Sequence, residues 1–156
     1  MEPFSEVAIT PEPINPFALR DSLPQLDASG GYVCFEGLVR NTNHGKSVDY
    51  LQYEAYRPLA ESEMKKIADE ALAKFGCLFV RAVHRVGDLA IGDVAVLIQV
   101  RGGHRDESFK ACRYVIDEIK GRVPIWKKET YLDGTTDWTR CQHGHGETDA
   151  AEAPHG

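Results

Sequence analysis

The sequence lacks the long hydrophobic runs, the signal peptide and the paired cysteines that mark membrane and secreted proteins. Its longest strictly apolar run, Val94 to Ile98, is far short of the ~20 residues that a membrane-spanning helix needs. The N-terminal residues contain neither the basic nor the apolar stretch of a signal peptide. The 4 cysteines are widely separated, which favours reduced thiols over a disulfide framework. We therefore expect a cytoplasmic protein that binds no membrane.

Internal repeats and nucleotide-binding glycine motifs are also missing. No segment recurs along the chain, and no glycine-rich phosphate-binding fingerprint follows a predicted strand. With 156 residues, 42% hydrophobic and 27% charged, the chain has the size and composition of one ordinary globular domain. Such a chain can bury its own core without a disulfide or a structural metal. We expect this domain to span residues 1–140.

The residues after this domain differ in composition. Residues 141–156 are poor in apolar side chains, so we expect a disordered tail. Cys141, His143 and His145 in this tail have a spacing that could suit a metal ion. Histidines in a tail of this kind are more often incidental, and the sequence therefore predicts neither a metal site nor a bound cofactor.

The net charge of −6 conceals one basic segment. Between Arg101 and Lys128 there are 8 basic and 4 acidic residues, whereas the rest of the chain is acidic overall. A protein that coats nucleic acid is usually basic overall, so this pattern indicates a local anion site and no nucleic-acid partner. For any single lysine, a solvated helix face remains the alternative.

Hydrophobic periodicity and turn residues predict the element order β-α-β-β-α-β-β-α-β. Strands are expected at residues 7–10, 32–40, 48–56, 78–86, 93–101 and 125–131, and helices at 16–23, 58–75 and 105–120. We expect the 48–56 strand to pair with the 32–40 strand, and Gly76 to end the second helix. This order predicts an α+β fold, a two-layer α/β sandwich with mostly antiparallel strands in a single domain.

Two groups at the ends of strands could bind an anion. Arg40, at the end of the 32–40 strand, can hold phosphate or carboxylate in a bidentate fork, although an arginine that only anchors its own turn is an equal alternative. Gly102-Gly103-His104-Arg105 opens a helix, where the backbone N–H groups and the charge of Arg105 favour an anion. The alternative is a flexible joint, with Asp106 serving the helix start.

Lysines at the end of the basic segment could carry chemistry. Lys120 ends a helix, where a lysine commonly just complements the helix dipole. In the 125–131 strand, alternation places Lys127 and Glu129 on one face, with Trp126 and Lys128 on the other. A lysine in a partly dry pocket could act as a general acid or base, or as a nucleophile.

The predicted helix separates these two groups. His104 and Lys120 are 16 residues apart in sequence, which corresponds to roughly 24 Å along a helix. One small ligand cannot contact both residues of the same chain. Either there are two sites, or a symmetric dimer brings His104 and Arg105 of one protomer to Lys120 and Lys127 of the other.

Four sequence blocks resemble a known family when they are taken together and in order. They are Phe35-Glu36-Gly37-Leu38-Val39-Arg40-Asn41, His84-Arg85-Val86-Gly87, His104-Arg105 leading into Phe109, and Lys120-Gly121-Arg122-Val123-Pro124-Ile125-Trp126-Lys127-Lys128-Glu129. These blocks resemble the large, catalytic subunit of molybdopterin synthase, the MoaE family. The match runs from about Val7 to Trp138, and its most specific part is the Lys-x-Arg-x-Pro-x-Trp-Lys stretch.

The resemblance implies a sulfurtransferase of molybdenum cofactor biosynthesis. Such enzymes convert cyclic pyranopterin monophosphate to molybdopterin by installing two sulfurs as a dithiolene. The sulfurs come from the thiocarboxylated C-terminal Gly-Gly of a small ubiquitin-like subunit of the MoaD type. The resemblance also implies a homodimer at the core of a heterotetramer, with one small subunit at each end.

The resemblance also implies roles for individual residues. Lys120 and Lys127 would be catalytic, with Lys120 facing the thiocarboxylate and Lys127 exchanging a proton, or the reverse. The substrate-binding residues would be Leu38, Val39, Arg40, His104, Arg105, Lys120, Lys127, Lys128 and Glu129. The Gly102-Gly103 pair departs from the family, where bulkier small residues are expected. A module that binds phosphate or nucleotide without chemistry is the competing hypothesis.

Overall fold

A computed structural model describes residues 2–140 of the chain. Its elements are β1 (Phe4–Thr10), α1 (Pro16–Asp21), β2 (Gly31–Leu38), β3 (Thr42–Asn43), β4 (Lys46–Ala55), α2 (Arg57–Phe75), β5 (Phe79–Arg85), β6 (Gly87–Ala90), β7 (Val94–Gly102), α3 (Arg105–Arg122), β8 (Ile125–Tyr131) and β9 (Thr136–Arg140). The predicted tail 141–156, with Cys141, His143 and His145, lies outside the described residues. No helix within residues 2–140 is long and apolar enough to cross a membrane.

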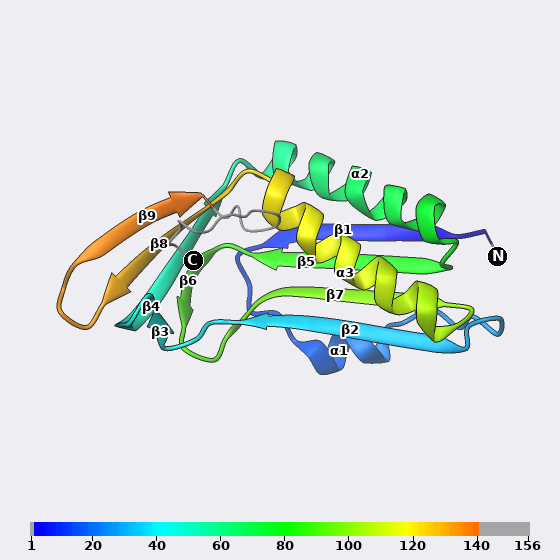
Figure 1. Cartoon of the computed structure of the whole chain (residues 1–156), viewed down its shortest axis with the longest axis horizontal. Helices are drawn as coiled ribbons and strands as arrows, with labels where there is room; N and C mark the ends of the chain where they lie inside the picture. Colours follow the sequence, from blue (N-terminus) through cyan, green and yellow to red (C-terminus); the bar gives the residue numbers. More distant parts are fainter. Residues whose placement is uncertain (1, 141–156) are drawn as a thin grey trace.

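The first sheet has the strand order β1-β5-β7-β2 and carries the main core. β1 and β5 are parallel, whereas the β5–β7 and β7–β2 pairs are antiparallel. Helices α2 and α3 lie side by side across one face of this sheet (Figure 1). Apolar side chains from the strands, such as Val80 and Ile98, are fully buried together with Ile67 and Val115 of these helices. The burial of this apolar surface is the main stabilising contribution to the fold.

The second sheet is antiparallel and was not predicted as a separate sheet. It has the order β3-β4-β8-β9, with β6 also pairing with β4. The expected pairing of residues 48–56 with 32–40 is wrong, because β2 pairs with β7 while β4 pairs with β6 and β8. The chain leaves the first sheet after β2, where the register shifts at Gly37/Leu38 and the N–H of Val39 donates to the Asp93 carbonyl. The structure is therefore a single α+β domain with one mixed and one antiparallel sheet.

Local signals predicted the three helices and six of the strands, with each end within three residues of the observed one. The Asn15 side chain accepts hydrogen bonds from the N–H groups of Phe17 and Ala18 at the start of α1. Gly76 ends α2 in the left-handed region, with a φ of 67°, as the sequence predicts. At the start of α3, Glu107 rather than Asp106 accepts from the His104 N–H, at 3.1 Å. β3, β6 and β9 escaped prediction because all three are short and lack a run of alternating apolar residues.

Gly102 allows β7 and α3 to meet closely. A Cβ at this position would clash with the Ser108 hydroxyl and lie 3.1 Å from Cγ of Glu107. On the neighbouring loop, the N–H of Gly30 donates to the carbonyls of Gly102 and Gly103, each at 3.1 Å. The small residues at 102 and 103 therefore allow the close turn that carries His104.

We expect Gly102→Ala to lower the free energy of unfolding by about 1–3 kcal/mol, since the added methyl overpacks a closed turn. Urea unfolding measures this change. Removing the Ser108 hydroxyl as well, in a Gly102→Ala/Ser108→Ala variant, should recover part of the loss. A Gly102→Ala protein as stable as the wild type would show that this contact does not constrain the turn.

Candidate active site

A pocket of about 560 Å³ lies where the two sheets meet the last turn of α3. Its lining comes from six segments: the end of β2 with the residues that follow it, β3, β4, β7, α3 and β8. The lining residues are Phe35, Glu36, Gly37, Leu38, Val39, Arg40, Thr42, Asn43, Leu51, Tyr53, Ala95, Val96, Lys120, Lys127 and Glu129. Two lysines, an arginine and one buried carboxylate thus share a single cavity.

The two predicted lysines reach this pocket from different elements. Lys120 lies in the last turn of α3 and is half-buried. Lys127 lies on β8, opposite Tyr53 of β4, and its side chain is only 14% exposed. Helix α3 positions Lys120 and strand β8 positions Lys127, so regular secondary structure rather than a loop holds both side chains.

Glu129 is a buried carboxylate in the lining of the pocket. The side-chain amide of Asn43 donates to both of its oxygens, at 2.7 and 2.8 Å, and the Tyr131 hydroxyl donates at 2.7 Å. Nζ of Lys127 lies 3.5 Å from Oε2. Burial acts to raise the pKa of Glu129, but the Tyr131 hydroxyl, the Lys127 charge and the Asn43 amide outweigh it and lower the pKa. Glu129 is therefore ionised at neutral pH and attracts the Lys127 ammonium.

Six of the nine residues predicted to bind substrate or act in catalysis line this pocket. They are Leu38, Val39, Arg40, Lys120, Lys127 and Glu129. Val39 is buried and is held through backbone hydrogen bonds to Asp93 and Gly92, whereas Arg40 is exposed. The structure thus brings together residues that are up to 91 positions apart in sequence (from Leu38 to Glu129).

The other three predicted residues do not line the pocket. His104 and Arg105 are at the opposite end of α3, and the His104 side chain is 87% exposed. Lys128 lies on the other face of β8, where its Nζ is 5.7 Å from the centre of the Trp138 ring. The alternation of β8 that was predicted from the sequence explains why Lys127 and Lys128 face opposite sides.

Asn43 and Tyr53 are pocket residues that sequence reasoning missed. Asn43 lies between the strands predicted at 32–40 and 48–56, and it donates to a residue 86 positions further along the chain. A two-residue turn in which His44 and Gly45 both have positive φ directs β3 back along β4 and places this amide. No local pattern signals such a contact. Phe35, Glu36 and Gly37 could have been predicted as pocket residues, because they belong to the first block that carries the family resemblance.

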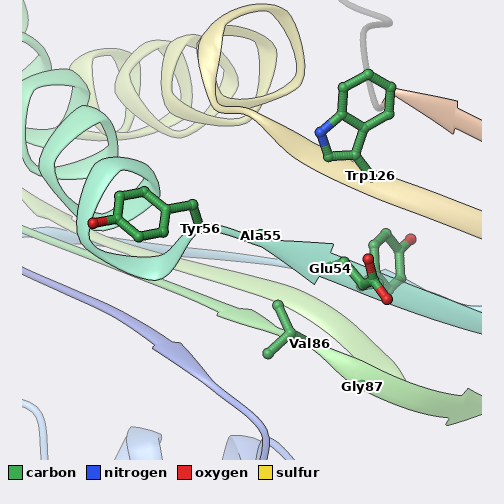
Figure 2. A pocket seen from close by; sticks show the side chains of 7 residues that line it. Glu54, Ala55, Tyr56, Val86, Gly87 and Trp126 are labelled. Carbon is green, nitrogen blue, oxygen red and sulfur yellow. The ribbon is translucent and has the colours of Figure 1, made fainter.

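A second pocket, of about 460 Å³, adjoins the first through Tyr53, which lines both. Figure 2 shows it at the end of β4, with Trp126 of β8 on one side and Val86 and Gly87 on the other. Apart from Tyr53, its lining residues are Glu54, Ala55, Tyr56, Val86, Gly87 and Trp126. It contains no basic residue, whereas Arg40, Lys120 and Lys127 line the first pocket.

The cysteines in the described part of the chain are poor candidates for chemistry. Burial raises the pKa of the Cys77 thiol to about 11 and that of Cys112 to about 12, and it also raises the pKa of Cys34. These thiols are therefore protonated at neutral pH and are poor nucleophiles. Within residues 2–140, no three His, Cys, Asp or Glu side chains gather in a way that could hold a metal ion. The lysine pocket is the better candidate for chemistry.

The chain resembles proteins of one family over most of its length. The family model for the MoaE protein matches residues 9–122. The molybdopterin synthase catalytic subunit of Thermoplasma volcanium is 42% identical over 132 residues, which cover 85% of this chain and 96% of that protein.

Solved structures agree with this similarity. The crystal structure of molybdopterin synthase from Staphylococcus aureus matches with a TM-score of 0.76 and 41% identity, covering 89% of this chain and 98% of that one. A protein–protein complex of subunits 1 and 2 of molybdopterin-converting factor from Helicobacter pylori contains the same fold, with a TM-score of 0.64, 19% identity and 87% of each chain covered.

The family model, the relative and the crystal structure agree with the resemblance seen in the sequence and confirm it. They also confirm the predicted function in molybdopterin biosynthesis and the class of enzyme. The chain belongs to the MoaE family, whose members are molybdopterin synthase catalytic subunits, a class of sulfurtransferases.

Proposed function

We propose that this chain transfers two sulfurs from the thiocarboxylated C-terminus of a small ubiquitin-like subunit to cyclic pyranopterin monophosphate, forming the molybdopterin dithiolene. The reaction takes place in the cytoplasm, on the domain formed by residues 1–140. The observation that carries the proposal is the convergence of Lys120 and Lys127 in one pocket with the ionised Glu129.

The chemistry needs cations close to the reacting sulfur. The thiocarboxylate sulfur attacks an electrophilic carbon of the pterin side chain, so that a C–S bond forms, a C–O bond to that carbon breaks, and the small subunit is joined to the substrate through a thioester. Water then cleaves the acyl–sulfur bond, the small subunit leaves as a carboxylate, and the sulfur stays on the substrate with its electron pair. A second small subunit repeats these steps, and no oxidant or reductant is needed.

The two lysines fit complementary parts of this chemistry. Lys120 faces the incoming thiocarboxylate, whose negative charge its ammonium attracts. Lys127, held beside Glu129, donates a proton to the leaving oxygen. Asn43 and Tyr131 keep Glu129 ionised and thereby keep Lys127 in place. This arrangement supports Lys127, rather than Lys120, as the proton-exchanging residue.

The substrate phosphate requires a second copy of the chain. His104 and Arg105 begin the 18-residue helix α3 and Lys120 lies near its end, which separates them by roughly 24 Å. In our proposal, Arg40 of one protomer binds the phosphate together with the partner's His104 and Arg105. The active unit is then a homodimer with two composite sites.

The exposed edge of β2 supports this dimer. β2 is an outer strand of the first sheet, and Phe35 and Leu38 on it are 39% and 57% exposed. Beside it on α3, Phe109 is 62% exposed. An apolar, unpaired edge strand is a surface that tends to pair with another strand. We propose that β2 pairs with its counterpart across a two-fold axis.

Antiparallel pairing of the two β2 strands would complete the site. Within one chain, Gly31 at the start of β2 pairs with Gly102, next to the His104 turn. Across a two-fold axis, the Gly31 end of one β2 strand lies against the Leu38 end of the other. The His104 turn of one protomer would then lie beside Arg40 and the pocket of its partner.

The small subunit completes the assembly as a heterotetramer. The Helicobacter pylori structure of similar fold is a complex of the two subunits of molybdopterin-converting factor. The pocket lies at the surface, where the Leu38 and Arg40 side chains are exposed, so an extended Gly-Gly tail can enter it.

We expect Lys120→Ala and Lys127→Ala each to reduce dithiolene formation by about 10²–10⁴-fold, because each removes a charge that acts during sulfur transfer. The assay supplies cyclic pyranopterin monophosphate and the thiocarboxylated small subunit. Lys66→Ala is the matched control, since Lys66 is an exposed lysine of α2 that pairs with Glu63. A wild-type protein that binds the pterin without turnover would favour the binding module.

Mixing two inactive variants tests the composite site. A heterodimer of Arg105→Ala and Lys127→Ala protomers contains one intact site of two, so a random 1:1 mixture should recover about 25% of the wild-type activity. Each variant alone forms no intact site. A mixture no more active than its parents, with subunit exchange verified by mass spectrometry, would place the whole site within one chain.

The buried Glu129 predicts a pH-dependent stability. Its pKa lies below the ordinary value of 4.5, so its ionised form stabilises the fold above about pH 4.5, and this contribution is lost as the pH falls through the lower folded pKa. Tyr131→Phe removes one donor and should cost about 1–3 kcal/mol of unfolding free energy at pH 7. Denaturant unfolding at pH 7 and pH 3.5 checks this. An equal cost at both values would contradict a role for the ionised carboxylate.

A further inference from the structure

His84 is a buried histidine close to the catalytic pocket, and the mechanism above does not use it. It lies on β5, directly opposite Val96 of β7, and Val96 lines the pocket. On its other side it pairs with Ile9 of β1. Its side chain is 1% exposed, and the Tyr53 ring packs edge-on against the imidazole with 5.1 Å between ring centres. A polar ring therefore lies among apolar neighbours, just behind the pocket wall.

The hydrogen bond of His84 fixes the tautomer of the ring. Nδ1 lies 2.8 Å from the Arg85 carbonyl oxygen, which can only accept, so Nδ1 carries the proton. Burial and the charge of Lys120 lower the pKa of His84 to about 3, although the hydrogen bond to the Arg85 carbonyl acts to raise it. The ring is thus neutral at physiological pH, and Nε2 keeps its lone pair.

The same side of β5 faces the helix that carries Lys120. Val80 and Ala82 alternate with His84 along β5 and belong to the core beneath α2 and α3. Ile119, the residue before Lys120, is buried in that core. His84 and Lys120 therefore lie on the same side of the first sheet, with His84 behind the pocket-lining Val96 of β7 and Lys120 in the lining itself.

We propose that His84 is a positioning residue for Lys120. The neutral imidazole beneath Tyr53 offers Nε2 as a fixed hydrogen-bond acceptor, which directs the Lys120 ammonium into the pocket. This role rests on the proposed function only for its catalytic consequence. The contact itself is a property of the folded protein. Tyr53 acts as a lid that keeps water from the acceptor and keeps the ring in one orientation.

Nitrogen NMR of the histidine side chains tests the contact without turnover. We expect the His84 signals to report a neutral ring with the proton on Nδ1 from pH 5 to pH 9. The Nε2 signal should shift in Lys120→Ala and stay unchanged in Lys66→Ala. A proton on Nε2, or an Nε2 signal that Lys120→Ala does not move, would overturn the proposal whatever the activity of the enzyme.

Two substitutions of His84 separate an acceptor from a packing group. In His84→Gln the side-chain amide oxygen can replace Nε2 as an acceptor, whereas His84→Phe fills the space without one. We expect kcat for dithiolene formation to fall about 10–100-fold in His84→Phe and much less in His84→Gln, with KM for the pterin unchanged in both. Equal loss in two folded variants would assign His84 to packing alone. If neither variant folds, the NMR result decides.

Discussion

The length of α3 is the constraint on which the proposed two-chain site depends. An unbroken helix of 18 residues holds His104 and Arg105 at one end of the first sheet and Lys120 at the other. No rearrangement of side chains can close a gap of roughly 24 Å. A phosphorylated substrate that needs both groups must therefore meet them from two chains, and the exposed apolar edge of β2 is the surface that could bring the chains together.

Charge in the pocket is arranged through buried hydrogen bonds rather than through a general excess of basic residues. The chain carries a net charge of −6, yet the pocket gathers Arg40, Lys120 and Lys127. Glu129 is the one carboxylate there that is buried, and Asn43 and Tyr131 both donate to it. A buried carboxylate without such donors would destabilise the fold. The hydrogen bonds that hold Glu129 beside Lys127 therefore also help to stabilise β8 against β3.

The sequence predicted those features that depend on local spacing. Alternation along residues 125–131 correctly separated Lys127 and Glu129 from Lys128, and the glycine at position 76 correctly ended α2. The pairing of β4 was mispredicted because neighbours in sequence were taken as neighbours in the sheet, whereas β4 completes its hydrogen bonds with β6 and β8. Asn43 could not be found at all, since only the folded chain brings it to Glu129. The composite dimer site remains a prediction.

The crystal structure of the Lys127→Ala dimer with cyclic pyranopterin monophosphate bound would test the composite site most directly. Loss of turnover in this variant should preserve the substrate for observation. We expect the pterin to lie in the pocket beside Lys120, with its phosphate held by Arg40 of one protomer and by the partner's His104 and Arg105. A substrate held by the residues of one chain alone, or bound away from Lys120, would contradict the two-chain active site.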